Sequence, residues 1–130
     1  MFNHQGFPLC TIYTNLGEEA VVHGINQTKS THVITTHDLL PKFKGILQHT
    51  PTVTHVIYFE DQIKSTPVAG FPGEPNIVPF WDVVSRGKKV CESIEVQPIT
   101  PGPTDIGIIM YTSGSTGRVV GQQNSDRNCD

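Results

Sequence analysis

The sequence predicts an α/β fold in which strands alternate with helices. Three short runs read as strands, namely Leu9–Tyr13, His32–Thr36 and His55–Phe59, and two segments with helical character separate them. The connections are short, which favours parallel pairing with right-handed crossovers. The order β-α-β-α-β therefore predicts a partial Rossmann-like three-layer unit on a parallel sheet. Such a fold assigns no function by itself.

The first helix is expected to follow the strand at Leu9–Tyr13. Asn15 offers an N-cap, and Glu18 stands three residues later, as a capping box requires. Gly24 is expected to end the helix. Its apolar stripe is loose, so the helix is predicted mainly from its start and stop signals.

The second helix is expected to begin at Asp38, whose side chain can cap it. Pro41 falls in the first turn, where its missing N–H does no harm. The strand His55–Phe59 that follows is nearly all apolar, as a strand covered on both faces should be. Apolar residues at helical spacing form the predicted buried face of the helix: Leu39, Leu40, Phe43, Ile46 and Leu47.

The region after the third strand is rich in proline and glycine. Glu60–Pro79 is expected to be a surface loop for this reason. Phe80–Arg86 predicts a short helix that ends at Gly87. A further loop, Pro98–Thr104, is stiffened by its prolines and leads into the next strand.

The run Asp105–Gly117 is the most informative stretch. It begins with apolar β-branched residues, which predict a short buried strand, and ends in glycines and small hydroxyl residues. Gly114 and Gly117 can adopt positive φ, so successive backbone N–H groups can turn inward to form an anion nest. These features predict a phosphate site. Hydroxyl donors are added at the same place by Thr112, Ser113, Ser115 and Thr116.

Other readings of this loop remain open. A Gly/Ser/Thr run is also typical of a flexible turn or linker. The run lacks the Gly-Lys-Ser/Thr ending of a Walker A loop, and its glycine spacing differs from the dinucleotide-binding fingerprint.

Composition excludes several classes of protein. The net charge is −3 and there is no basic cluster, so nucleic acid is not an expected partner. No apolar run approaches the roughly 20 residues of a membrane span, and no cleavable signal follows Met1. Cys10, Cys91 and Cys129 are odd in number and far apart, which favours reduced thiols in a cytosol-facing protein.

The six histidines do not predict a metal site. None falls at a ligand spacing with cysteine or carboxylate partners apart from the pair His32 and His37. The pair His37-Asp38 is interpreted as a helix-capping segment rather than a catalytic dyad. The sequence therefore gives no catalytic residue and no metal ligand.

The end of the chain differs in character from the rest. Gln122–Asp130 contains no aliphatic or aromatic side chain, so it cannot contribute to a core. We expect a partial domain over residues 1–118 and a divergent, disordered tail over residues 119–130.

The string Tyr-Thr-Ser-Gly-Ser-Thr-Gly at Tyr111–Gly117 resembles the phosphate-binding signature of the adenylate-forming, or AMP-binding, enzymes. Several further segments resemble the long-chain acyl-CoA synthetases of that superfamily. The resemblance covers roughly Phe2 to Arg118 and implies part of the N-terminal domain of such an enzyme. These segments are Leu16–Val21, Gly24–Asn26, Val33–Thr36, Leu39-Leu40 and His55–Phe59.

The resemblance implies an activity and a set of ligands. The family activates a long-chain fatty acid with ATP and Mg²⁺ to an acyl-adenylate, and coenzyme A then gives acyl-CoA and AMP. The family acts at the endoplasmic reticulum or other intracellular membranes, and membrane association would run through parts absent from this chain. By position, the β- and γ-phosphates would be wrapped by Thr112, Ser113, Gly114, Ser115, Thr116 and Gly117.

Departures from the family pattern limit what is expected of this chain. The family loop continues with Pro-Lys-Gly, whereas Val119 and Val120 stand where the proline and lysine belong. The adenine, ribose and Mg²⁺ motifs of the family are not found after Gly121. We therefore expect a ligase fragment that is inactive on its own. Two alternatives remain, a non-catalytic α/β module that binds phosphate or a protein partner, and an unstable fragment.

Overall fold

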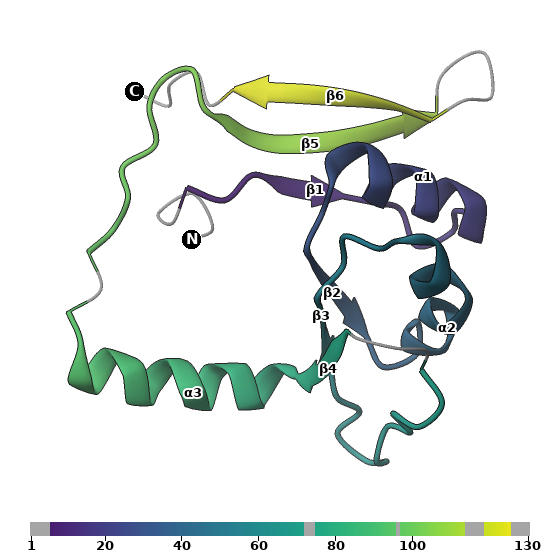
Figure 1. Cartoon of the computed structure of the whole chain (residues 1–130), viewed down its shortest axis with the longest axis horizontal. Coiled ribbons are helices and arrows are strands. Elements are labelled where there is room, and N and C mark those ends of the chain that lie inside the picture. The colour runs from purple at the N-terminus through teal and green to yellow at the C-terminus, as the bar shows by residue number, and fades with distance from the viewer. Residues whose placement is uncertain (1–5, 72–74, 96, 114–118, 126–130) are drawn as a thin grey trace. The chain divides into compact units, whose positions relative to one another are not determined.

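The computed structural model describes residues 6–71, 75–95, 97–113 and 119–125. It confirms a mixed α/β fold with parallel strands (Figure 1). The strands form two three-stranded sheets, in the orders β1-β5-β6 and β2-β3-β4. The chain divides into two compact units, residues 17–95 and residues 1–16 with 96–130. Each unit is described by itself.

The sheet of the unit 17–95 is parallel throughout. Strands β2 (His32–Thr36) and β3 (His55–Phe59) have the predicted bounds and pair in register along their whole length. Strand β4 (Asn76–Pro79) pairs with β3. The prediction of a loop throughout Glu60–Pro79 was therefore wrong at its end. The apolar part of β4 is too short, beside its prolines, to signal a strand.

Helix α1 (Glu18–Thr28) confirms the first predicted helix but not its ends. The helix begins after Gly17, so the predicted capping box at Asn15 was wrong. Gly24 is buried inside the helix rather than ending it. The chain leaves the helix at Lys29, which adopts a left-handed φ of 52°. The sequence signals misplaced the ends because Gly24 was taken as the stop, whereas the left-handed residue that ends the helix is a lysine.

The second predicted helix is three short helical turns. These are η2 (Leu40–Lys42), α2 (Phe43–Ile46) and η3 (Leu47–His49), in which 3₁₀ geometry flanks a single α-turn. Leu39 occupies the cap position, so the prediction that Asp38 caps this helix was wrong. Leu39 itself is half-buried. The other four residues of the predicted face are buried: Leu40, Phe43, Ile46 and Leu47.

The core of this unit lies on one face of its sheet. Val56 and Tyr58 of β3 are 0% and 6% exposed. Successive residues of a strand point to opposite faces, and Ile34 and Phe59 on the other face are 45% and 41% exposed. One face of the sheet therefore packs against the helical turns, while the other is partly open.

Helix α3 (Phe80–Ser93) is longer than predicted. It runs through Gly87, where a single glycine costs a helix only about 1 kcal/mol. Its first turn packs on the sheet, because the rings of Phe80 and Phe59 lie 4.3 Å apart. None of its residues is buried within the part of the chain that the structure describes.

The second unit contains strands β1 (Leu9–Thr11), β5 (Ile106–Ser113) and β6 (Val119–Ser125). Strand β1 pairs in parallel with β5, so the expectation that it joins the sheet of β2 and β3 was wrong. The stretch Val119–Ser125, expected to be disordered, instead pairs antiparallel with β5. Backbone pairing stabilises it without a need for apolar side chains. Residues 126–130 lie outside the described residues, and the domain division at residue 118 stays a prediction.

Candidate functional site

The predicted phosphate-binding segment begins at the end of β5, which pairs antiparallel with β6 (Figure 1). Thr112 and Ser113 are the last two residues of β5, and they pair with Val120 and Val119 of β6. Gly114, Ser115, Thr116 and Gly117 lie outside the described residues. The structure therefore describes only the first two residues of the predicted segment, Thr112 and Ser113, and pairs them with β6.

Strand β5 is the central strand of its sheet. It pairs with β1 on one side, in a register that places Cys10 beside Ile109, and with β6 on the other. The pairing with β1 covers Ile108–Met110, whereas Thr112 and Ser113 pair with β6 alone. The start of the predicted phosphate segment therefore lies beyond the part of β5 that is paired on both sides.

Tyr111 anchors the strand immediately before Thr112. Its side chain is only 2% exposed. Burial raises the pKa of the Tyr111 phenol, and the neighbouring Cys10 thiol raises it further. The prediction of a buried strand holds on this face only, since Ile106 and Met110 on the other face are 39% and 40% exposed.

Position 120 lies at the base of the hairpin turn. Val120 stands where the resemblance places a lysine, and it is the register partner of Thr112. Residues that pair across two strands lie about 5 Å apart. A cation at position 120 would therefore start from a backbone position adjacent to the predicted phosphate donors.

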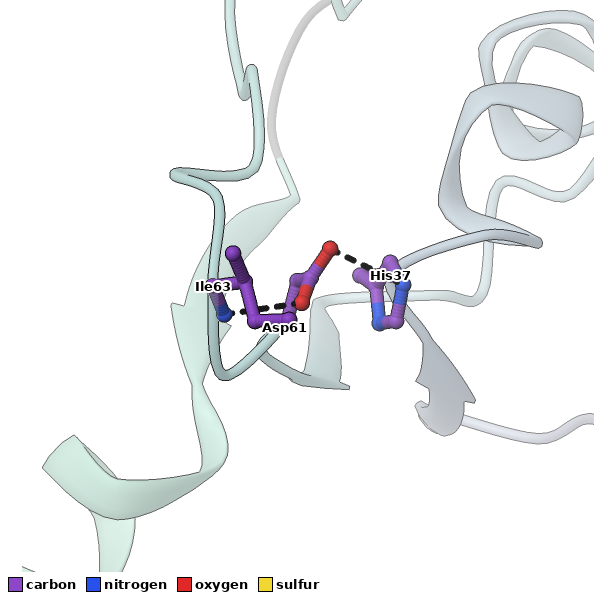
Figure 2. A network of polar contacts seen from close by, with 3 residues as sticks. All are labelled: His37, Asp61 and Ile63. Atoms are coloured by element: carbon purple, nitrogen blue, oxygen red, sulfur yellow. Dashed lines mark hydrogen bonds and ion pairs between the residues drawn. The ribbon is translucent and has the colours of Figure 1, made fainter.

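A second polar site lies at the carboxyl ends of β2 and β3. His37 follows β2, and its Nε2 lies 3.7 Å from Oδ2 of Asp61, which follows β3 (Figure 2). The other carboxylate oxygen of Asp61 accepts a hydrogen bond of 2.9 Å from the backbone N–H of Ile63. Ligands of α/β proteins often bind at this edge of a parallel sheet.

Sequence reasoning did not find this pair. It assigned His37 and Asp38 to helix capping, whereas the structure joins His37 to Asp61. A hydrogen bond from the Thr36 hydroxyl lowers the pKa of the exposed Asp38, with a smaller contribution from His37. The signal that could have found the pair was topological, because His37 and Asp61 both follow parallel strands of one sheet.

The arrangement around His37 and Asp61 supports little chemistry. Their side chains are 40% and 29% exposed, so solvent screens the pair. The pocket of about 410 Å³ beside it is lined by Tyr58 and residues 60–66, all from one strand and the loop that follows it. Among the described residues, no group of three or more metal-ligating side chains is assembled. Nor does any described helix have the length and apolar character needed to cross a membrane.

Comparison with known proteins identifies relatives that match most of this chain. The chain is 35% identical to Long-chain-fatty-acid–CoA ligase 1 of Saccharomyces cerevisiae, over 90% of this chain and 19% of the yeast protein. It is 34% identical to Long chain acyl-CoA synthetase 8 of Arabidopsis thaliana, over 87% of this chain and 15% of the plant protein. The chain therefore spans under a fifth of the length of these relatives.

A solved structure with the same fold is the adenylation domain of a carboxylate reductase from Mycobacterium chelonae. Its TM-score is 0.70 at 19% identity, over 88% of this chain and 19% of that chain. A likeness at this identity concerns the fold alone. The family of AMP-binding enzymes matches residues 3–128, which includes the hairpin and nearly all of the sequence. The chain therefore belongs to the AMP-binding enzyme family.

Proposed function

We propose that this chain is part of a long-chain fatty acid–CoA ligase and that residues 112–117 bind the β- and γ-phosphates of ATP. The observation that supports the proposal is the β5–β6 hairpin, whose first strand ends in Thr112 and Ser113, the first two residues of the segment. Strand β5 delivers Thr112 and Ser113 directly after the buried Tyr111. The named relatives are long-chain ligases, which supports a long-chain fatty acid as substrate.

The chemistry of the segment suits a departing pyrophosphate. When a fatty acid carboxylate attacks the α-phosphate of ATP, the α–β bond breaks and negative charge develops on the leaving oxygens. Backbone N–H groups and the hydroxyls of residues 112–117 would donate hydrogen bonds to that charge. Coenzyme A would then attack the acyl-adenylate and release AMP.

The donor set fits an anion rather than a metal ion. Hydroxyl and N–H donors match phosphate oxygens, and the segment contains no carboxylate of the kind that usually holds Mg²⁺ in proteins. We propose that Mg²⁺ arrives with the nucleotide, where it would neutralise phosphate charge. Residues 112–117 would therefore orient the phosphates without coordinating the metal themselves.

We further propose that the 130-residue chain has no ligase activity of its own. Valine at position 120 offers no positive charge to the phosphates, and the chain spans under a fifth of its relatives. The test is an ATP–pyrophosphate exchange assay with a long-chain fatty acid. Exchange above background that depends on the fatty acid would show that this part of the proposal is wrong.

A second candidate is a non-catalytic module that binds phosphate or a protein partner. The missing cation at Val120 favours it, because charge neutralisation matters more for phosphoryl chemistry than for weak binding. The two candidates predict different activities for a chimera in which residues 106–121 replace the corresponding segment of the yeast ligase. The activity measured is ATP–pyrophosphate exchange. If exchange is lost and then recovers with Val120→Lys, the segment is a ligase element. If exchange is not recovered, the binding module is favoured.

A further inference from the structure

Two histidine rings stack at the amino edge of the sheet β2-β3-β4. His32 and His55 are the first residues of β2 and β3, and they are register partners. Their ring centroids lie 4.8 Å apart and their planes differ by 3°. Asn76, the first residue of β4, is the next partner in the row, and its Nδ2 lies 3.5 Å from Nε2 of His55. All three strands therefore begin on one row of polar side chains.

Each ring is also held by the threonine that precedes it. The hydroxyl of Thr31 lies 2.9 Å from Nδ1 of His32, and that of Thr54 lies 3.0 Å from Nδ1 of His55. The Thr54 hydroxyl donates to the carbonyl oxygen of Thr31 at 3.1 Å. The Thr54 hydroxyl has one proton, and this bond uses it. The hydroxyl oxygen therefore accepts a hydrogen bond from Nδ1–H of His55. Nε2 of His55 is then an acceptor for the Asn76 amide.

This geometry does not suit a shared metal ion. The lone pair of an imidazole nitrogen lies in the plane of its ring. Two planes that differ by 3° do not meet at a point within metal–ligand distance of both rings. The arrangement instead places two imidazole rings face to face, and each ring can accept a proton.

We propose that the stacked His32–His55 pair is a proton-sensitive clamp on the amino edge of this sheet. With at most one ring protonated, the stack holds the starts of β2 and β3 together. A second proton places two positive charges face to face, and a proton on Nε2 of His55 also removes the acceptor for Asn76. The clamp then loosens.

The backbone bonds that the clamp protects are identified by the structure. The N–H of Thr54 donates to the carbonyl of Thr31 at 2.8 Å, and the N–H of Asn76 donates to the carbonyl of Thr54 at 2.9 Å. Both bonds join the strand starts beside the two rings. Their amide exchange rates therefore report directly on loosening of this edge.

Other titratable groups near the edge do not offset the charge of the pair. Lys29 ends α1 and His49 ends η3, and neither provides a carboxylate. Within the described residues, the polar contacts of the two rings come from uncharged side chains, and neither ring forms an ion pair. The like charges of a doubly protonated pair would be opposed only by solvent and salt.

The test follows the ring Cε1–H signals and the amides of Thr54 and Asn76 by NMR between pH 8 and pH 5. In the unaltered chain, coupling should broaden the protonation curve of His55, and in His32→Gln the curve should become a single simple step. Amide exchange, corrected for its intrinsic pH dependence, should accelerate roughly two- to fivefold more in the unaltered chain than in His32→Gln, the size expected for facing like charges. His23→Gln, an exposed histidine on α1, is the matched control and should leave both readouts unchanged.

A charge-compensating variant separates the clamp from general loss of structure. Asn76→Asp places a carboxylate beside Nε2 of His55 and should suppress the acceleration at pH 5. If the His55 curve is unchanged by His32→Gln, the proposal is wrong. It is equally contradicted if the amides loosen as much in Asn76→Asp as in the unaltered chain.

Discussion

Tyr111 links the interior of its unit to the proposed phosphate segment. Its phenol is buried, and both burial and Cys10 raise its pKa above the ordinary value near 10. The folded chain therefore holds the phenolic proton to higher pH than the unfolded chain does. The stabilisation is fully present below about pH 10 and is lost as pH rises through the raised pKa of the folded state.

The residue-scale prediction concerns alkaline stability. Tyr111→Phe should reduce the loss of unfolding free energy between pH 9 and pH 11, because the group that titrates is gone. The measurement is denaturant unfolding across this pH range, with Tyr13→Phe as the control, since Tyr13 is 57% exposed. Equal pH slopes for the unaltered chain and Tyr111→Phe would contradict the prediction.

Lys29 provides a second prediction at the residue scale. Among the residues that the structure describes, Lys29 is a non-glycine residue with a positive φ, 52°. In this left-handed conformation an L side chain is disfavoured by about 1 kcal/mol. Lys29→Gly should therefore stabilise the chain by about 0.5–1 kcal/mol in denaturant unfolding. Lys29→Ala keeps a Cβ in the same conformation and should give no such gain. A destabilised glycine variant would show that the lysine side chain matters more than its backbone.

At the scale of elements, the sequence predicted strands better than helix ends. The bounds of β2 and β3 were predicted because each is a short apolar or β-branched run between polar breakers. The ends of α1 and α3 were missed because Gly24 and Gly87 were taken as stop signals. A glycine inside a helix costs only about 1 kcal/mol, so a single glycine does not end a helix by itself.

Helix α3 allows that cost to be measured. A Cβ at Gly87 would meet no atom within 4 Å, so Gly87→Ala should stabilise the chain by about 0.5–1 kcal/mol through better helix propensity. Gly70→Ala is the matched comparison, because Gly70 has a φ of 81° and alanine is strained there. The two substitutions should shift the thermal midpoint in opposite directions. A shift of the same sign in both would contradict the helix assignment at Gly87.

At the scale of the molecule, pairing between distant segments lay beyond the sequence. The pattern β-α-β-α-β indicated the α/β class but not the pairing of β1 with β5. The residues of a strand do not by themselves determine which other strand it pairs with. Strand β6 was missed for a related reason, since its composition is polar and only its pairing with β5 orders it. The strand that carries Thr112 and Ser113 was predicted from the sequence. The His37–Asp61 pair was not, because finding it requires knowing that β2 and β3 are neighbouring parallel strands.

The open face of the sheet β2-β3-β4 gives a prediction at this scale. Ile34 is 45% exposed on that face, so the isolated chain should bind an apolar dye. Ile34→Thr should lower dye binding while changing unfolding free energy by less than about 0.5 kcal/mol. Val56→Thr, at a fully buried position on the other face, should instead destabilise by about 1–3 kcal/mol. Unchanged dye binding in Ile34→Thr would place the apolar surface elsewhere.

The most direct test of the proposed phosphate site is an NMR titration of the 130-residue chain with Mg²⁺–ATP, and with AMP as the matched control. If residues 112–117 hold the β- and γ-phosphates, the amide signals of this segment should shift with ATP, and those of Thr112 and Ser113 should shift much less with AMP. Val120→Lys should strengthen ATP binding by about fivefold, as an added charge contact of about 1 kcal/mol would. Shifts confined to other parts of the chain, or equal shifts with ATP and AMP, would contradict the account.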